Sequence, residues 1–452
     1  MSSDVEWLRL DQVVDEIIDR RGVTPIKLGG DFVESGHRVI SAKLIKGGRV
    51  QLDADVPRFV DSTIYKKWMK SPLCVGDVLM TSEAPLGELA FLDCDTDWVL
   101  GQRLFAIRPK KQILDGRFLY YTLHTDQVRA DIQGRATGTT VQGIRQAELR
   151  LVQVPIPSMP AQLAAATILA ALDDRITLLR ETNATLEAIA QAIFKSWFVD
   201  FDPVRAKQEG RAPEGMDEAT AALFPDSFEE SALGLVPSGW RVRAISEVAE
   251  VVKGKSYSSK DLTDSHHTAL VTLKSFERGG GFRLDGFKPY TGSYKSAQVV
   301  EPGDLIVAYT DVTQAAELIG KPAIVVGVED HSTLVASLDV GIVHPDEEQV
   351  SRQFLYGLFR TEVFQSHTFS HTSGTTVLHL AKDGVGSFQF ACPPADVVNA
   401  FSLLAESLAQ RNQTNIDQMR TLATLRDTLL PRLISGQLRL PDAEDIIAET
   451  VT

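Results

Sequence analysis

Residues 172–198 read LDDRITLLRETNATLEAIAQAIFKSWF, and this stretch indicates how the whole chain is organised. Its seam positions recur at alternating intervals of three and four residues, which is the heptad pattern of a helix that pairs with another helix. The seam consists of Ile176, Leu179, Asn183, Leu186, Ala190, Ile193 and Trp197. One polar side chain in such a seam, here Asn183, can fix the register of the pairing. The sequence therefore predicts a long helix with a helical partner.

A second heptad pattern near the C-terminus supplies that partner. Prolines precede both patterns, at Pro157 to Pro160 and at Pro393-Pro394, and proline suits the start of a helix. The alternative is that each helix packs as a simple amphipathic helix against its own globular part. Two such helices at equivalent places favour pairing with each other. The predicted interface comprises Ile176, Leu179, Asn183, Leu186, Ile193, Trp197, Met419, Leu422, Leu429 and Leu433.

The chain also repeats its globular sequence at one constant offset. Three features recur 236 residues later: Phe118-Leu119-Tyr120 as Phe354-Leu355-Tyr356, Gly138-Thr139-Thr140-Val141 as Gly374-Thr375-Thr376-Val377, and Pro157 as Pro393. Gly76-Asp77-Val78-Leu79 likewise resembles Gly303-Asp304-Leu305-Ile306. Such glycine turns are common, but a shared offset across several motifs indicates an internal repeat.

These patterns predict an α+β chain with a pseudo-twofold internal repeat of two similar mixed α/β domains and two long paired helices. A helix is expected over residues 118–132 and again over 354–369. The expected parts are domain 1 (1–157), the central helix (158–200), an irregular linker (201–235), domain 2 (236–393), the distal helix (394–440) and an acidic tail (441–452).

Composition excludes several classes of protein. Apolar residues make up 44% of 452, no stretch of 18 apolar residues predicts a membrane span, and the N-terminus lacks the apolar core of a secretory signal. The 3 cysteines are widely spaced, which fits the reducing cytoplasm. We expect no metal site, because the cysteines lack ligand spacing and His266-His267 is the only close histidine pair.

The net charge of −14 is unfavourable for binding a polyanion. The charge is uneven: residues 1–157 carry 21 basic and 21 acidic side chains, and residues 236–393 carry 14 and 18. These two segments hold 35 of the 46 lysines and arginines. Even so, neither is a basic domain, so tight binding to nucleic acid would need a basic partner.

Two regions resemble the conserved regions of type I restriction-modification specificity subunits. The first runs through Val154-Pro155-Ile156-Pro157, Gln162, Leu172-Asp173-Asp174, Leu186-Glu187-Ala188-Ile189 and Ile193 to Phe201, and the second through Arg420 to Leu440 with Leu429-Leu430-Pro431-Arg432-Leu433-Ile434-Ser435-Gly436. The resemblance covers nearly the whole chain in the family's order of domains and helices. One departure is Ala161-Gln162 where the family usually has Glu-Gln.

The resemblance implies that each domain is a target recognition domain for one half of an asymmetric, interrupted site in double-stranded DNA. It implies that the two helices pair antiparallel and set the gap, with no catalytic residue and no cofactor in this chain. Two modification subunits would bring S-adenosylmethionine and adenine-N6 methylation, and restriction subunits would use ATP and Mg²⁺. All would lie in the cytoplasm of a bacterium or archaeon. A helix over residues 172–198 spans roughly 40 Å, comparable with one turn of duplex at about 34–36 Å.

Candidate DNA contacts follow from residue chemistry around the glycine-rich loops and Gly-Thr-Thr turns. Lysine and arginine suit phosphates, while amide, hydroxyl and guanidinium groups also read base edges. In domain 1 the candidates are Lys43, Lys46, Arg49, Tyr65, Lys66, Lys67, Arg135, Thr137, Thr139, Thr140 and Gln142. In domain 2 they are Lys274, Arg278, Arg283, Tyr294, Lys295, His371, Ser373, Thr375 and Thr376.

Two other classes of function were weighed against this reading. A methyltransferase or nuclease is disfavoured because Gly254-Lys255-Ser256 lacks the first glycine of a phosphate-binding loop. Cys392-Pro393-Pro394-Ala395 also lacks the amide or carboxylate and the aromatic ring of an adenine methyltransferase. A coiled-coil scaffold without a role on DNA remains the second alternative.

Overall fold

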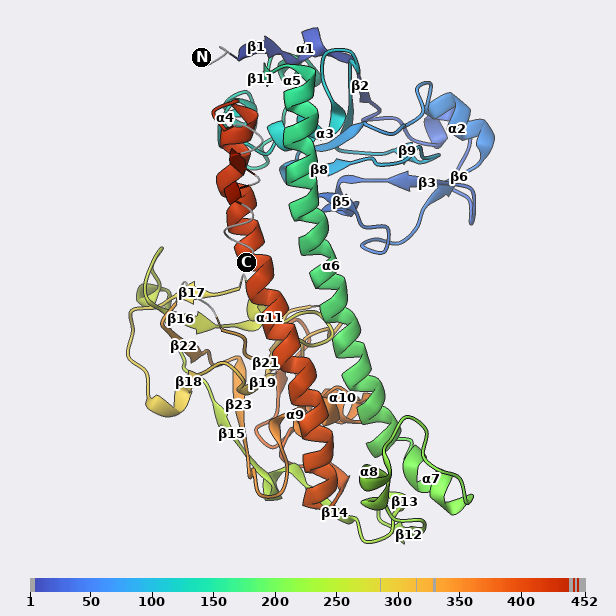
Figure 1. Ribbon diagram of the computed structural model, residues 1–452, viewed down its shortest axis with the longest axis vertical. Helices are drawn as coiled ribbons and strands as arrows, with labels where there is room; N and C mark the ends of the chain where they lie inside the picture. The colour runs from blue at the N-terminus through green and yellow to red at the C-terminus, as the bar shows by residue number, and fades with distance from the viewer. Residues whose placement is uncertain are drawn as a thin grey trace. The chain divides into compact units, whose positions relative to one another are not determined.

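The computed structural model of the chain describes residues 5–284, 286–313, 315–327, 331–438, 442–443 and 445–446. It consists of two compact units, one formed by Met1–Leu179 with Asp417–Thr452 and the other by Arg180–Ile416. Two helices of 40 residues, α6 (Met159–Phe198) and α11 (Ala395–Ile434), contribute one half to each unit (Figure 1). No helix within the described residues is both long and apolar enough to span a membrane.

The globular part of the first unit is built around an antiparallel sheet in the order β2-β10-β7-β8. Smaller sheets join β1 to β11, β4 to β5, and β6, β3 and β9 in that order. Its strands are β1 (Glu6–Arg9), β2 (Val14–Asp19), β3 (His37–Ile40), β4 (Ile45–Lys46), β5 (Arg49–Val50), β6 (Phe59–Val60), β7 (Val78–Ser82), β8 (Leu86–Phe91), β9 (Val99–Leu100), β10 (Leu104–Pro109) and β11 (Gln153–Ile156). Its helices are α1 (Leu10–Val13), α2 (Ser62–Trp68), α3 (Gly116–Thr122), α4 (Asp126–Gly134) and α5 (Gln146–Leu149).

The second unit repeats this topology. The sheet β15-β23-β19-β21 has the order and antiparallel directions of β2-β10-β7-β8, and β14 pairs with β26 as β1 pairs with β11. The parallel pair β16 and β22 repeats the parallel pair β3 and β9. Its strands are β12 (Phe228–Ser231), β13 (Gly234–Pro237), β14 (Arg241–Ala244), β15 (Ala249–Lys253), β16 (Thr268–Val271), β17 (Lys288–Pro289), β18 (Val299–Val300), β19 (Leu305–Ala308), β20 (Thr310–Asp311), β21 (Pro322–Ile324), β22 (Thr333–Ala336), β23 (Val340–Pro345), β24 (Thr372–Ser373), β25 (Leu378–Leu380) and β26 (Gln389–Cys392). Its helices are α7 (Asp202–Gln208), α8 (Glu218–Ala222), α9 (Arg352–Phe359) and α10 (Glu362–Ser370).

The repeated Gly-Asp motif forms the same turn before β7 and before β19. Gly76 and Gly303 have φ values of +93° and +94°, which glycine adopts at no steric cost. Each following carboxylate accepts a hydrogen bond from the backbone three residues earlier, Asp77 from Cys74 at 3.0 Å and Asp304 from Glu301 at 2.8 Å. The sequence repeat therefore reflects a repeated strand entry.

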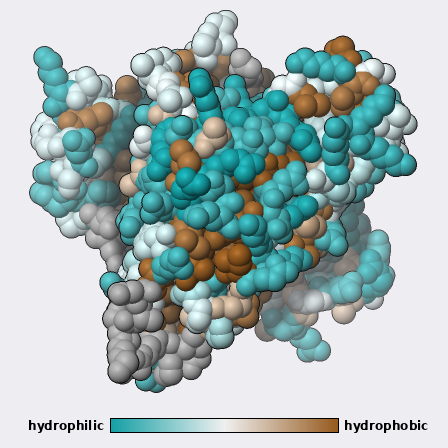
Figure 2. Space-filling view, turned by 90° about the horizontal axis from the view of Figure 1, so that it is seen from above, coloured by the Kyte–Doolittle hydropathy of each residue, from teal (hydrophilic) through white to brown (hydrophobic). Residues whose placement is uncertain are grey.

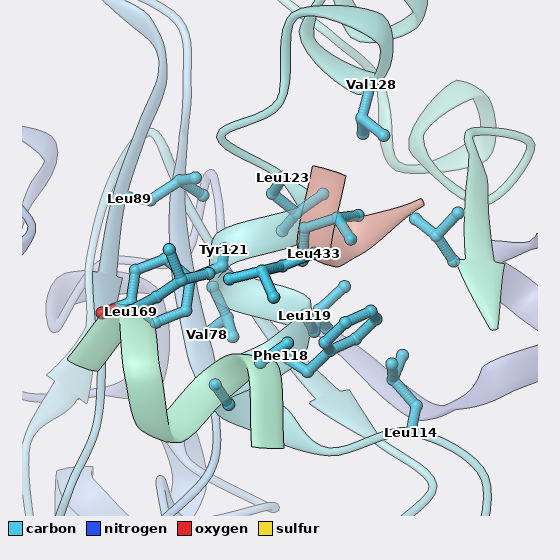
Figure 3. Close-up of a cluster of buried hydrophobic side chains, with 14 of the residues drawn as sticks. Val78, Leu89, Leu114, Phe118, Leu119, Tyr121, Leu123, Val128, Leu169 and Leu433 are labelled. Atoms are coloured by element: carbon cyan, nitrogen blue, oxygen red, sulfur yellow. The ribbon is translucent and has the colours of Figure 1, made fainter. Parts of the chain in front are cut away.

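The core of the first unit joins the sheet to both long helices. Leu169 of α6 and Leu433 of α11 point into the same cluster as Phe118, Leu119 and Val78 (Figure 3). Burying one such large apolar side chain stabilises the folded unit by about 1.5–3 kcal/mol. In the second unit an aromatic cluster has the same role, with Phe194 and Trp197 of α6 and Phe401 of α11 buried together. Each globular part is therefore fastened to both helices.

The two helices run antiparallel. In the first unit Asp173 of α6 contacts Arg426 of α11, and in the second unit Asn183 contacts Asn415. The partner's number falls as the number along α6 rises, which defines the direction. The predicted fold class, two similar α/β domains with a pseudo-twofold repeat and an antiparallel helix pair, is confirmed.

The structure differs from the sequence prediction in two places. The helices expected over residues 118–132 and 354–369 are each broken in two, because the Thr125 and Thr361 hydroxyls donate to the carbonyl oxygens of Thr122 and Leu358, both at 2.7 Å. Such side-chain bonds compete with the helical pattern. Residues 201–235, expected to be irregular, contain α7, α8 and most of the β12–β13 hairpin. Most of the expected acidic tail, 441–452, lies outside the described residues.

Candidate nucleic-acid interface

The two Gly-Thr-Thr turns have the same backbone shape. Gly138 has φ +113° and Gly374 has φ +108°. A Cβ atom at either glycine would collide with the carbonyl oxygen three residues later, that of Val141 or Val377. Only glycine fits such a close approach with a positive φ. The threonines that follow, Thr139, Thr140, Thr375 and Thr376, are all exposed, as are Thr137, Gln142 and Ser373 beside them.

Each turn is attached to the end of the third strand of its main sheet. In the first unit Thr137 and Gly143 exchange two backbone hydrogen bonds, and Ile144 donates to Ser82 at 3.0 Å. In the second unit β24, β25 and β20 form the corresponding ladder, and Leu380 donates to Tyr309 at 2.9 Å. The turn is therefore held by a rigid sheet edge while its tip faces solvent.

Lys43 and Lys274 occupy equivalent positions. Each is the middle residue of a 3₁₀ turn, Ala42–Leu44 or Leu273–Ser275, that directly follows the parallel strand β3 or β16. Both side chains are exposed, and the Lys43 ammonium lies 3.7 Å from Asp55. An exposed lysine at the same place in both repeats has the chemistry of a phosphate contact.

Glycines follow each lysine and bring the backbone to the surface. Gly47 and Gly48 form the two-residue turn of the β4–β5 hairpin, with positive φ at both positions, which is the geometry favoured in tight hairpins. Exposed Lys46 and Arg49 flank that turn. In the second unit Gly279, Gly280 and Gly281 all have positive φ. Arg278 beside them is exposed and forms an ion pair with Glu317 at 3.2 Å, whereas Arg283 is partly buried.

The helix pair has an apolar interface with one polar pair. Ile176, Leu179, Leu422, Leu429 and Leu433 are buried in the first unit and Trp197 in the second, while Leu186, Ile193 and Met419 are partly buried. The Asn415 amide donates to the Asn183 side chain at 2.7 Å, and Asn183 donates to the Asn412 carbonyl at 3.3 Å. Asn415 is fully buried.

Comparison with known proteins assigns this architecture to a family. The family model described as "Type I restriction modification DNA specificity domain" matches residues 41–188. The chain is 26% identical over 426 residues to the Haemophilus influenzae type I restriction enzyme HindI specificity subunit, with 82% of this chain and 88% of the relative covered. It is 24% identical to the Methanocaldococcus jannaschii MjaIX specificity subunit, with 81% and 78% covered. The chain belongs to the family of type I restriction-modification specificity subunits.

A solved structure supports the fold of this specificity subunit. The type I restriction-modification S subunit from M. genitalium aligns with a TM-score of 0.53 at 14% identity, covering 95% of this chain and 96% of the other. At that identity the likeness concerns the fold alone. The specificity subunit is non-catalytic, as the family assignment implies. Among the residues that the structure describes, no His, Cys, Asp or Glu side chains gather in a set that could hold a metal ion.

The structure ties several other candidates of the specificity subunit to protein partners. Tyr65 stacks on the His37 ring at 4.1 Å, and burial, with Asp97 nearby, raises the pKa of its hydroxyl. Lys67 donates to the Leu28 carbonyl at 3.0 Å, and Lys66 on the same helix is exposed. These contacts give α2 a structural role, whatever it touches on DNA.

The remaining candidates differ in how freely they could reach a ligand. Arg135 lies 2.7 Å from Asp131 and 3.8 Å from Glu148, so its charge is compensated within the subunit. His371 lies against the His367 ring at 4.1 Å. Tyr294 and Lys295 are exposed in the loop before β18. On the face drawn in Figure 2, hydrophilic side chains cover most of the surface, with smaller hydrophobic patches between them.

Sequence reasoning missed Arg103 of the specificity subunit. This arginine lies in the β9–β10 turn with φ +63°, its carbonyl accepts from Ser82 at 2.9 Å, and its guanidinium lies 3.2 Å from Glu83 beside the Gly-Thr-Thr turn. The equivalent residue of the second repeat is Asp339, whose carbonyl accepts from Tyr309 at 2.8 Å. The constant offset of 236 residues could have identified this exchange of charge in the sequence.

Proposed function

We propose that this specificity subunit reads a two-part, asymmetric site in double-stranded DNA, one half with each repeat. The supporting observation is a duplicated fold whose equivalent surface positions are alike in phosphate-binding chemistry but different in base-reading chemistry. Lys43 and Lys274 are alike, while Arg103 and Asp339 have opposite charges. Two domains that share a fold and differ at such turns suit two different half-sites.

The helix pair supports a role in setting the gap between the half-sites. Each helix has 40 residues, which corresponds to about 60 Å at 1.5 Å per residue. An antiparallel pair with a packed apolar seam resists bending, so it suits a spacer better than a flexible linker does. We propose that helix length, rather than any contact to the intervening bases, determines the gap.

We further propose that the subunit functions within a complex containing two modification subunits and restriction subunits. The chain carries a net charge of −14, which opposes binding to DNA by the subunit alone. Basic partner surfaces that share the duplex would offset this repulsion. The partners would also supply S-adenosylmethionine, ATP and Mg²⁺, for which we assign no site in this chain.

The test is to purify the chain with its modification subunits and map methylated adenines after reaction with genomic DNA. We expect one motif in two dissimilar parts, with one modified adenine in each part and on opposite strands. Methylation that does not depend on sequence would favour a coiled-coil scaffold. Methylation by the chain alone, or binding of S-adenosylmethionine to it, would favour an enzyme instead.

A further inference from the structure

The second unit contains a lysine whose charge no acidic group neutralises. Lys321 directly precedes strand β21 and is partly buried. Burial lowers the pKa of its ammonium, the positive charge of Arg360 lowers it further, and Asp311 opposes both. Across the described part of the chain, the Lys321 ammonium has neither an ion pair nor a hydrogen bond. A desolvated charge of this kind is unfavourable unless a counter-ion accompanies it.

The nearby carboxylates are already engaged. Asp311 is fully buried and accepts backbone hydrogen bonds from Thr313 at 2.6 Å, Leu318 at 2.6 Å and Ile319 at 2.9 Å. Although burial disfavours its charge, these bonds lower the pKa of Asp311. The carboxylate therefore organises the loop that leads to Lys321 and does not form an ion pair with it.

Arg360 is held in place by two partners of its own. Its Nη1 donates to the Glu187 carboxylate and to the Tyr356 hydroxyl, both at 2.9 Å. Glu187 thus belongs to Arg360, and Glu317, on the same loop as Asp311, belongs to Arg278 at 3.2 Å. The group of Lys321, Arg360 and Arg278 therefore has more positive than negative charge to satisfy.

This charge lies beneath the glycine loop. Gly281 donates to the Pro322 carbonyl at 2.9 Å, and a Cβ built on Gly280 would lie 3.2 Å from that oxygen and 4.0 Å from Arg360 Nη1. Three successive glycines leave this part of the surface without side chains. A bulky anion could therefore approach the backbone closely, as at other glycine-rich loops.

We propose that Lys321, with Arg360 beside it, binds a phosphate of the DNA backbone under the Gly279–Gly281 loop. This inference rests on the proposed function, since it assigns a contact within the same DNA complex. The phosphate oxygens supply the negative charge that the protein withholds from Lys321. Because every nucleotide carries a phosphate, the contact positions the duplex without reading its sequence.

The test uses the full chain assembled with its modification subunits and Lys321→Gln. The probes are a duplex carrying the site found by methylation mapping and an unrelated duplex of equal length. We expect about tenfold weaker binding to both duplexes, the range of a lost charge-assisted contact, and a slope of log affinity against log salt that is shallower by about 0.9. Lys382→Gln, which removes an exposed lysine of the same domain, serves as the matched control and should leave both quantities unchanged.

Stability measurements separate this role from a structural one. Because the protein leaves the Lys321 charge uncompensated, Lys321→Gln should leave the melting temperature of the free subunit unchanged or raise it, and Lys321→Arg should retain DNA affinity. Unchanged affinity and salt slope for Lys321→Gln would overturn the inference, and so would weaker binding to the specific duplex alone. If the wild-type complex has no two-part site, the proposed function fails before this variant is compared.

Discussion

At the scale of single residues, glycine is required where each Gly-Thr-Thr turn folds back on itself. We predict that Gly138→Ala destabilises the first unit by about 1–3 kcal/mol, because alanine is strained at φ +113° and its Cβ would meet the Val141 carbonyl. Urea unfolding measures this change. The control is Gly134→Ala at the end of α4, where the added Cβ meets nothing within 4 Å. There alanine should be neutral or stabilising by up to about 1 kcal/mol.

His124 provides a pH-dependent test of the same unit. Burial lowers the pKa of its imidazole, while a hydrogen bond at 2.9 Å between Nδ1 and the Tyr120 carbonyl opposes the shift. The unfolded chain therefore binds the proton more readily, so stability is complete above the unfolded pKa of about 6.5 and is lost as pH falls below it.

We predict that His124→Gln flattens the rise in unfolding free energy between about pH 5 and pH 7.5. Chemical denaturation of both proteins across this range measures the slope. Parallel curves for wild type and variant would mean that His124 titrates alike in both states. Exposed His267 is a suitable control, because His267→Gln should leave the slope as it is.

At the scale of elements, a carboxylate on α6 connects three helices of the first unit. Asp173 accepts from Arg426 of α11 at 2.7 Å and from the Tyr121 hydroxyl of α3 at 2.8 Å. We predict that Asp173→Ala lowers unfolding free energy by about 1–3 kcal/mol, because two partly buried donors lose their acceptor. Its neighbour Asp174 is exposed, and Asp174→Ala should change stability by less than about 0.5 kcal/mol. Equal effects of the two variants would remove Asp173 from this role.

Elements also show where sequence information was sufficient. The heptad seam and the prolines before it predicted both long helices, because periodicity over many residues is a strong signal. The breaks at Thr125 and Thr361 depend on single hydroxyl bonds inside otherwise helical patterns, so periodicity did not reveal them. The β12–β13 hairpin was missed because its glycine and proline content resembles that of a loop.

At the scale of the whole molecule, the internal repeat was predictable because motifs separated by 236 residues share one register. The charge environment of the candidate site was not. Whether Arg135 is neutralised by Asp131, or Lys321 is left without a partner, depends on side chains brought together only by the fold. Sequence chemistry could name exposed lysines such as Lys43, but not the pairing state of a charge.

The helix pair gives a prediction about the gap in the recognised site. One added heptad in each helix, after Arg180 and after Ile416, lengthens the pair by about 10 Å. At about 3.4 Å per base pair, the preferred gap should grow by about three base pairs while both half-sites stay the same. Methylation mapping of the variant complex measures the gap. An unchanged gap would mean that something other than helix length determines it.

The most direct test of two independent readers is to exchange one of them. Residues 1–157 are replaced by the corresponding domain of another specificity subunit, and the methylated motif of the assembled complex is mapped. We predict that one half of the motif changes to that of the donor, while the other half and the gap are retained. A change in both halves, or in neither, would contradict the account.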